Sequence, residues 1–502
     1  MLPVVTAAEM RALDRAASDE VGLPGFTLME TAGRGVADAA IDMLEAKRGH
    51  VAVVCGPGNN GGDGFVIARV LRGRGIDAIA YLAAERGAVK NDALAHLRVL
   101  ERSGGVILSI ATPQELDRHR DAIAGSDLAV DALFGIGLVR EVEGHLAAVI
   151  GAINATRLRL AVDLPSGLHT DTGKTLGVAV DAQRTVSMAA LKPALVSSPG
   201  FSKCGEVSVV DIGIPPALVG ASTPHAGLVE RADVVRWLPR ASQLDHKGRR
   251  GHVVVVSGQP EMRGAGRLAS NAALRAGAGL VTLVGVGDID AADSVMTKSL
   301  RHPAELAGFL EGKSAVVIGP GLGVGAAALA FVTQVLATGV PAVLDADALN
   351  VLADSPALLA SAAGPIVITP HPGEASRLLG IPVSEVEADR LAAARALAAD
   401  TRAVVVLKGA RTITCDGTLG DEHCAINPTG GPALATAGSG DVLAGAIGAL
   451  LAQGCSPADA ARAAVYLHGL AGEQLAAIYG SRGVISSDLP EAISRAIHTI
   501  CG

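Results

Sequence analysis

The stretch Ala437-Gly438-Ser439-Gly440-Asp441-Val442-Leu443-Ala444-Gly445 joins a glycine-rich loop directly to an apolar helix, which we expect over 442–453. Backbone N–H groups in the first turn of a helix lack partners within the helix and carry partial positive charge. They suit an anion, above all a phosphate, and glycine lets that anion come close. Asp441 stands where the helix begins, as an N-cap or as an acid or base acting on a hydroxyl.

A second glycine loop lies near the other end of the chain. A buried strand is predicted over 51–55, and it leads into Gly56-Pro57-Gly58-Asn59-Asn60-Gly61-Gly62-Asp63-Gly64. A helical pattern resumes at Phe65. This order of strand, glycine loop and helix is typical of a phosphate-binding turn. The loop matches neither the dinucleotide motif GxGxxG nor a P-loop, whose lysine it lacks.

Strand candidates alternate with helical patterns along the whole chain. In the first half they are 51–55, 76–82, 106–109, 128–134, 158–162, 185–188 and 207–210, and in the second half 252–257, 280–284, 315–318, 342–344, 366–368 and 404–407. Such alternation predicts parallel, doubly wound sheets of the α/β class. The chain is 49% hydrophobic but only 2% aromatic, so its cores must be aliphatic. A looser stretch over 219–245 predicts a linker between a domain at 1–218 and a domain at 246–502.

Several strands are followed by polar or glycine-rich segments. Asp131 and Asp163 end strands in the first half, and each is either a turn former or a site residue. In the second half the strands lead into Gly319–Gly323, DADALN at 345–350, TPHPGE at 369–374 and Lys408–Thr412. Ligands of open α/β sheets bind beyond the carboxyl ends of the strands. We therefore expect one site in each half.

Charge and cysteine content narrow the possible partners. The net charge is −8 and no basic block is visible, so a nucleic-acid partner is not expected. No uninterrupted apolar run of 18 residues and no signal peptide is visible, so we expect neither a membrane span nor secretion. The six cysteines are scattered without a CxxC pair, which favours reduced thiols in a cytoplasmic protein.

The motifs as a set resemble a known family, the bacterial bifunctional NAD(P)HX repair enzymes. GPGNNGGDG (56–64), VDALFGIGL (130–138) and VDLPSG (162–167) resemble the epimerase domain of that family. HKGRRGHV (246–253), GPGLG, DADALN, TPHPGE, LKG and GSGDVLAG resemble its dehydratase domain, which is ribokinase-like. The resemblance covers roughly residues 5–500 and implies a Rossmann-like N-terminal sheet beside a ribokinase-like C-terminal domain.

For the dehydratase domain, the resemblance implies removal of the C6 hydroxyl of (S)-NAD(P)HX with ADP, giving NAD(P)H, AMP and phosphate. Asp441 would be the catalytic base. Ala265, Gly323, His371 and Asp441 would contact the substrate. Lys408, Gly409, Ala410, Arg411, Thr412 and Gly440 would bind the adenine nucleotide. Mg²⁺ is expected beside the phosphates, because phosphoryl transfer needs charge neutralised. The sequence does not assign its ligands, and Asp347 and Glu374 are guesses.

For the epimerase domain, the resemblance implies interconversion of (R)- and (S)-NAD(P)HX with Asp163 as the acid or base near C6. The substrate would be bound by Asn59, Asn60, Gly61, Gly62, Asp63, Gly135, Ile136, Gly137, Leu138, Val139, Arg140, Glu141 and Asp163. Asn60, Asp131 and Ser166 match the family's potassium ligands, and oxygen donors of this kind suit a hard cation. The resemblance also favours a homo-oligomer.

The sequence departs from the family pattern at a few positions. Gly266 stands where alanine is expected, which puts the contact carried over to Ala265 in question, and Gly431 stands where asparagine is more frequent. Two other functions stay open. A ribokinase-type kinase would share the GSGD loop but leaves the N-terminal 220 residues without a role. A non-catalytic nucleotide sensor would have no need of both Asp163 and Asp441.

Overall fold

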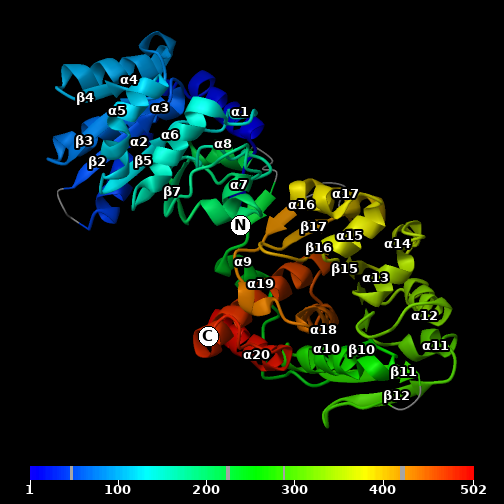
Figure 1. Ribbon diagram of the computed structural model, residues 1–502. Coiled ribbons are helices and arrows are strands. Elements are labelled where there is room, and N and C mark those ends of the chain that lie inside the picture. The colour runs from blue at the N-terminus through cyan, green and yellow to red at the C-terminus, as the bar shows by residue number, and fades with distance from the viewer. Residues whose placement is uncertain (46–48, 222–225, 287–288, 419–423) are drawn as a thin grey trace. The chain divides into compact units, whose positions relative to one another are not determined.

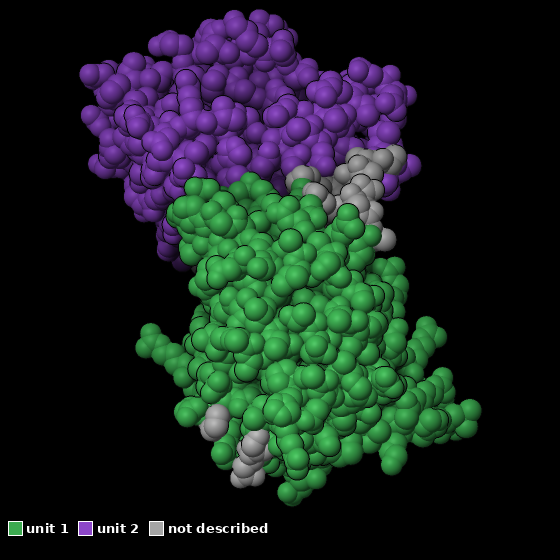
Figure 2. All heavy atoms as spheres, turned by 90° about the vertical axis from the view of Figure 1, so that its right-hand side faces the viewer, with its two compact units in different colours: residues 1, 227–502 green, residues 2–226 purple. Residues whose placement is uncertain are grey.

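The computed structural model describes residues 1–45, 49–221, 226–286, 289–418 and 424–502. The chain divides into two compact units, which Figure 2 shows in purple and green. The first unit comprises residues 2–226, and the second comprises Met1 and residues 227–502. Residues 222–225 of the expected linker lie outside the described residues. Residues 231–237, also in that stretch, form helix α9 of the second unit.

The first unit alternates strands and helices, as the blue to cyan part of Figure 1 shows. Its strands are β1 (Leu2–Val4), β2 (His50–Cys55), β3 (Asp77–Leu82), β4 (Val106–Ser109), β5 (Leu128–Ala132), β6 (Arg159–Val162), β7 (Arg184–Met188) and β8 (Glu206–Val210). Its helices are α1 (Ala7–Asp19), α2 (Gly25–Met43), α3 (Asn59–Gly73), α4 (Asn91–Arg102), α5 (Pro113–Ala124), α6 (Gly144–Ala155), α7 (Pro193–Val196) and α8 (Pro216–Ala221).

The sheet of the first unit is parallel and runs in the order β4-β3-β2-β5-β6-β7-β8. Alternate residues of β2 enter different cores. Val51 and Val53 pack with the helices α1 to α4, whereas Ala52 and Val54 pack with α5 and α6. Helices therefore cover both faces, which explains the unbroken apolar run of this strand. The strand order reverses between β2 and β5, the switch point at which such sheets bind ligands.

The second unit continues the alternation. Its strands are β9 (Ala226–Leu228), β10 (His252–Val256), β11 (Leu280–Val286), β12 (Met296–Leu300), β13 (Ala315–Ile318), β14 (Ala342–Leu344), β15 (Ile366–Ile368), β16 (Val404–Leu407), β17 (Ile413–Asp416) and β18 (Cys424–Ile426). Its helices are α9 (Arg231–Trp237), α10 (Arg263–Arg275), α11 (Glu305–Leu310), α12 (Ala326–Leu336), α13 (Asp347–Leu352), α14 (Ala357–Ala360), α15 (Pro372–Leu379), α16 (Val383–Ala388), α17 (Arg390–Thr401), α18 (Ser439–Ala452), α19 (Pro457–Tyr479) and α20 (Leu489–Cys501).

The sheet of the second unit runs in the order β9-β18-β17-β16-β15-β14-β13-β10-β11-β12. Pairing is parallel from β16 through β12 and antiparallel at β16–β17 and β17–β18. Helices α10, α18, α19 and α20 pack in one aliphatic core. There Gly445 allows α18 to approach α10, because a Cβ at Gly445 would lie 2.1 Å from the carbonyl oxygen of Ala269. The expected α/β class, with two units built on mainly parallel sheets, is confirmed.

One expectation about cysteines is wrong. Cys415 on β17 and Cys424 on β18 form a disulfide. The two residues lie directly opposite each other in the antiparallel pair. Sequence spacing did not reveal this pairing, because the residues meet only through the strand register. Cys55, Cys204, Cys455 and Cys501 form no disulfide and keep their thiols, as expected for all six.

Candidate active sites

The first glycine loop is shorter than predicted. Helix α3 begins at Asn59 with Gly58 as its N-cap, rather than near Phe65, so Asn59 to Asp63 form its first turns. Gly61 is required by packing, because a Cβ there would lie 1.8 Å from the carbonyl oxygen of Gly56. A Cβ at Gly58, in contrast, would meet no atom within 4 Å. The helix N-terminus stands at the carboxyl end of β2, next to the switch point, as an anion site requires.

The three residues expected to bind potassium meet at the ends of β2, β5 and β6. Oδ1 of Asp131 accepts a hydrogen bond of 2.6 Å from the Ser166 hydroxyl, and its Oδ2 accepts one of 2.7 Å from the Ser166 N–H. Asn60 donates through Nδ2 to the carbonyl oxygen of Phe134 at 2.9 Å. Asp131 is fully buried, and burial raises its pKa to about 6 against the hydrogen bonds that lower it. This set of carboxylate, hydroxyl, amide and carbonyl oxygens fits a hard cation.

Asp163 follows β6 and carries the left-handed backbone angle φ of 65°. Such an angle is strained for a residue with a side chain and persists only where its surroundings enforce it. The side chain is 12% exposed and is paired with the ammonium of Lys192, 2.5 Å away and fully buried. Sequence reasoning missed Lys192. It follows β7, the neighbouring parallel strand, so the strand-end rule that selected Asp131 and Asp163 covers this position too.

Asp63 lies beside this pair. It is 9% exposed, and its pKa is raised well above the ordinary value by burial and then by the charges of Asp163 and Asp14. Residues 135–141 follow β5 and lie largely on the surface, with Val139 78% exposed and Leu138 buried. Gly135 lies next to the expected potassium ligands, because a Cβ at Gly135 would lie 3.5 Å from the Asn60 side chain.

In the second unit, helix α18 begins at Ser439, three residues earlier than predicted. Its N-cap is Gly438, with a left-handed φ of 87° that favours glycine. Asp441 is therefore inside the first turn, and the interpretation of this residue as an N-cap is wrong. Its pKa is raised to about 7, mainly by burial and next by the charge of Asp345. A carboxyl that titrates near neutral pH suits proton transfer.

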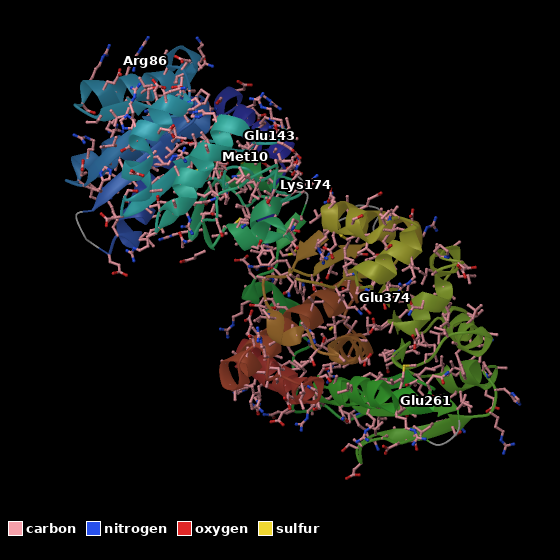
Figure 3. The ribbon with its side chains drawn as sticks, viewed as in Figure 1. Met10, Arg86, Glu143, Lys174, Glu261 and Glu374 are labelled. Carbon is pink, nitrogen blue, oxygen red and sulfur yellow. A yellow bond between two sulfur atoms is a disulfide. The ribbon has the colours of Figure 1, made fainter. Side chains whose placement is uncertain are left out.

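Lys408 and Asp345 bring three strand ends together around Asp441. The Lys408 ammonium lies 2.6 Å from Oδ1 of Asp345 and 3.9 Å from Oε2 of Glu374, which Figure 3 labels. A Cβ at Gly440 would lie 3.3 Å from the same ammonium. Lys408 and Gly440, both expected at the nucleotide, are thus neighbours. The motif DADALN was part of the sequence prediction, but Asp345 was not among the predicted site residues, although it directly follows β14.

The expected substrate contacts lie at neighbouring strand ends. Gly323 donates its N–H to Oδ2 of Asp347 at 2.8 Å, and Ala265 packs against Gly321, 3.2 Å from a Cβ placed there. His371 caps α15, since its Nδ1 accepts the Gly373 N–H at 3.0 Å. Its side chain is 51% exposed, which leaves the ring open to a ligand.

A small pocket opens beside Gly321 and Gly323, beyond the carboxyl ends of β10 and β11. Its lining comprises Ser257, Gly258, Gln259, Arg263, Leu283, Gly285, Val286, Ile289 and Asp290. The N–H groups of Gly258 and Gln259 donate to the carbonyl oxygen of Gly321 at 3.0 and 2.9 Å. Two lining residues therefore contact the glycine loop after β13, at the switch point between β10 and β13.

The segment from Lys408 to Thr412 is held by a buried arginine. Arg390 is 3% exposed and donates to the carbonyl oxygens of Leu407 and Lys408 at 3.3 and 3.1 Å. Thr412 donates its hydroxyl to the carbonyl oxygen of Gly409 at 2.9 Å, and Arg411 donates to that of Pro428 at 2.8 Å. Ala410 lies exposed between them. This turn faces the 427–441 segment through Arg411.

Within the residues described, no group of three or more His, Cys, Asp and Glu side chains is arranged to hold a metal ion. The carboxylates of Asp345, Asp347 and Glu374 instead lie around Lys408 and Asp441. Mg²⁺ is commonly held by one or two carboxylates together with phosphate oxygens, so these residues fit an ion that arrives with a nucleotide. In the described residues, no helix combines the length and apolarity needed to cross a membrane.

The fold and the sites define a two-domain α/β protein of the enzyme type. Each unit has a helix N-terminus suited to an anion and a candidate acid, the buried Asp163 in the first and the half-buried Asp441 in the second. A family model described as NAD(P)H-hydrate dehydratase matches residues 253–495, and one described as YjeF-related protein N-terminus matches residues 25–194. The bifunctional NAD(P)H-hydrate repair enzyme of Moorella thermoacetica is 42% identical over 97% of this chain and 95% of its own. The enzyme of the same name from Escherichia coli is 36% identical over 98% and 93%.

The chain belongs to the family of bifunctional NAD(P)H-hydrate repair enzymes. Solved structures resemble the second half. The ADP/ATP-dependent NAD(P)H-hydrate dehydratase from Bacillus subtilis is 29% identical, with a TM-score of 0.48, over 55% of this chain and 98% of that one. A ribokinase-like superfamily protein from Enterococcus faecalis is 26% identical, with a TM-score of 0.49, over 55% and 96%.

Proposed function

We propose that this chain repairs hydrated nicotinamide cofactors by two activities. Residues 1–218 epimerise (R)- and (S)-NAD(P)HX, and residues 246–502 dehydrate the S epimer to NAD(P)H with ADP. The observation that carries the proposal is family membership across both halves, in relatives named for repair of NAD(P)H hydrate. It is supported by a candidate acid in each unit: Asp163, which interacts with Asp63 on α3, and Asp441 in the first turn of α18.

In the dehydratase, Asp441 removes the proton of the C6 hydroxyl while the oxygen of that hydroxyl attacks the β-phosphoryl group of ADP. That oxygen–phosphorus bond forms while the bond to AMP breaks. Water is a poor leaving group from a neutral ring, whereas the phosphate ester leaves C6 as phosphate together with a proton of the neighbouring ring carbon. The N–H groups at the start of α18, around Gly440 and Asp441, hold the phosphoryl group as charge develops.

Lys408, next to Gly440, supplies positive charge to the phosphates of the nucleotide, and the segment from Lys408 to Thr412 binds the nucleotide together with Gly440. Mg²⁺ would be held by Asp347 or Glu374, with Asp345 at the same cluster, and would neutralise phosphate charge during transfer. The substrate lies against Ala265, Gly323 and His371. Their strands end on one edge of the sheet, next to the pocket that begins at Gly258.

In the epimerase, Asp163 transfers the proton that accompanies departure and return of the C6 hydroxyl on opposite faces of the ring. The first turns of α3, from Asn59 to Asp63, bind phosphate, and the exposed segment 135–141 covers the substrate. Potassium would be held by Asn60, Asp131 and Ser166, where it would offset the buried Asp131 carboxylate. The cytoplasm and a homo-oligomeric state belong to the same proposal.

The test mixes the purified protein with equal amounts of (R)- and (S)-NADHX, ADP, Mg²⁺ and K⁺ and follows NADH absorbance. Complete conversion with release of AMP and phosphate is the expected result. Conversion that stops at half means a working dehydratase without an epimerase. Absence of NADH with both ADP and ATP overturns the proposal, and a stable phosphorylated product under those conditions points to a kinase. Replacing K⁺ by Na⁺, and omitting Mg²⁺, tests each cation separately.

A further inference from the structure

A buried lysine lies at the centre of the first unit's site. Lys192 is fully buried, and the structure gives its ammonium an acceptor for each of its three N–H groups. These acceptors are Oδ1 of Asp163 at 2.5 Å, the carbonyl oxygen of Met188 at 2.9 Å and the hydroxyl oxygen of Ser187 at 3.0 Å. Burying an ammonium group away from solvent is costly unless a negative charge pairs with it and each N–H has an acceptor. Its position is therefore tightly defined by the ends of β6 and β7.

The two oxygens of Asp163 have different surroundings. Oδ1 accepts from Lys192 and from the Met188 N–H at 3.0 Å, with the Ser187 hydroxyl 3.5 Å away. Oδ2 accepts no hydrogen bond from any residue in the described parts of the chain. Since the side chain is 12% exposed, Oδ2 is the oxygen left for a ligand. Lys192 and Met188 thus orient the carboxylate by holding one of its oxygens.

Two further carboxyl groups interact electrostatically with Lys192. Asp14 on α1 and Asp63 on α3 both feel the repulsion of Asp163 and the attraction of Lys192. Burial is the largest cause of the raised pKa at each, and Arg15 also attracts Asp14. Lys192 is the cation common to these carboxyls and Asp163. Without it, three acidic groups would lie together in a site of low polarity, which disfavours their charged forms.

We propose that Lys192 is a positioning residue of the epimerase site, holding Oδ1 of Asp163 in the ion pair so that Oδ2 is turned toward the substrate. This inference rests on the proposed epimerase function. Lys192 contacts Asp163 rather than the reacting carbon, so its removal should change the pH at which Asp163 acts. The same reasoning predicts a small effect on KM, because substrate binding is left to the α3 turn and to 135–141.

The experiment measures epimerisation alone, without ADP, by chromatographic separation of (R)- and (S)-NADHX from pH 5 to 10. For Lys192→Met we expect kcat at pH 7 to fall at least about tenfold. The acid limb of the pH–rate profile should move to higher pH, and part of the rate should return at pH values above that limb. Lys192→Arg keeps the charge, so its acid limb should stay near that of the unchanged protein even where kcat falls. Lys203→Met is the matched control, since it removes the exposed ion pair of Lys203 with Asp181 in the same unit.

Several results separate this inference from the proposed function. If the unchanged protein does not epimerise, the epimerase assignment itself fails. If it does, an unmoved acid limb in Lys192→Met, or a loss of equal size at every pH, overturns the role of Lys192. Should Lys192→Met not fold, as judged by circular dichroism, Lys192→Arg decides: a limb displaced as far as one pH unit contradicts the inference. Dehydration of pure (S)-NADHX by the same samples checks the concentration of intact protein.

Discussion

Oδ1 of Asp345 lies 2.6 Å from the Lys408 ammonium, joining residues 63 positions apart at the ends of β14 and β16. This pair sets the charge around Asp441, whose pKa Asp345 raises and Lys408 lowers. Burial is the largest cause of the raised pKa of Asp441. Asp345 and Lys408 therefore adjust a pKa that burial has already moved toward 7.

The pH dependence of dehydration should follow from that arrangement. As the proposed base, Asp441 would act only when ionised, and its pKa is about 7, so kcat/KM should fall below pH 7. Asp345→Asn removes a repelling charge and releases Lys408 toward Asp441, so the acid limb should move to lower pH. Dehydration of (S)-NADHX from pH 5 to 9 measures this, with exposed Asp354→Asn as control. A limb that rises or stays in place contradicts the prediction.

Asp441→Asn should lower kcat of dehydration by roughly 10²–10⁴-fold, the usual contribution of a general base. Epimerisation by the same chain should be unchanged, because the acid proposed for that reaction is Asp163 in the other unit. Asp163→Asn should give the reverse pattern. Both rates are measured on each variant. Loss of both activities from either single change, in a protein that still folds, would be incompatible with separate sites.

Asp441 should also make stability depend on pH. Its folded-state pKa is raised above the ordinary value, so its stabilising contribution is complete below about pH 4 and is lost as pH rises through about 7. Replacement by Asn removes this cost of a buried charge. We expect Tm of Asp441→Asn to exceed that of the unchanged protein by several degrees at pH 8 and by less at pH 5. Scanning calorimetry at both pH values is the measurement, and equal differences would count against it.

Gly58, the N-cap of α3, and Gly61, at the start of that helix, provide a matched pair. A Cβ at Gly61 meets the backbone oxygen of Gly56, whereas one at Gly58 meets nothing within 4 Å. Gly61→Ala should therefore displace the start of α3, cost about 1–3 kcal/mol and reduce epimerisation. Gly58→Ala should change stability little, because its φ of −91° is open to any residue. Urea denaturation and the epimerisation rate test both; equal behaviour would refute the packing argument.

The disulfide between Cys415 and Cys424 should contribute to the stability of the second unit. It closes a loop with a sequence separation of nine, for which chain entropy gives about 2–3 kcal/mol. Guanidinium unfolding followed with and without a reductant should show this difference, and Cys415→Ser should abolish the effect of the reductant. Cys455→Ser, which removes a free thiol, should leave that effect intact. Insensitivity of the unchanged protein to reductant would mean that the bond does not form in solution.

The sequence pattern located the central strands of both sheets, but it missed β1, β9, β12, β17 and β18 and misjudged where two helices begin. Both α3 and α18 start inside their glycine-rich segments, at Asn59 and Ser439. Glycine has a low helix propensity and no apolar side chain, so a prediction from apolar spacing places the helix start too late. Packing overrides that propensity, as the contacts at Gly61 and Gly445 show. The consequence is chemical, since Asp441 belongs to the first helical turn and not to a cap.

The residues that sequence reasoning missed share one property. Lys192 and Asp345 become informative only through a partner distant in the chain, Asp163 for the first and Lys408 for the second. Cys415 and Cys424 likewise meet through the register of β17 and β18. A single sequence contains no record of such partners, because burial and strand order are settled by the whole sheet.

The amino-acid sequence by itself determined the α/β class, the two glycine loops, the acids at strand ends and the family resemblance, since these depend on local periodicity and short motifs. Only the tertiary structure decided which charges pair, which oxygen of Asp163 stays free and why Asp441 titrates near neutral pH. The physical reason is that hydrogen bonding and loss of solvent act between side chains that parallel strands bring together across tens of residues. Local pattern selects the residue types, and the sheet selects their partners.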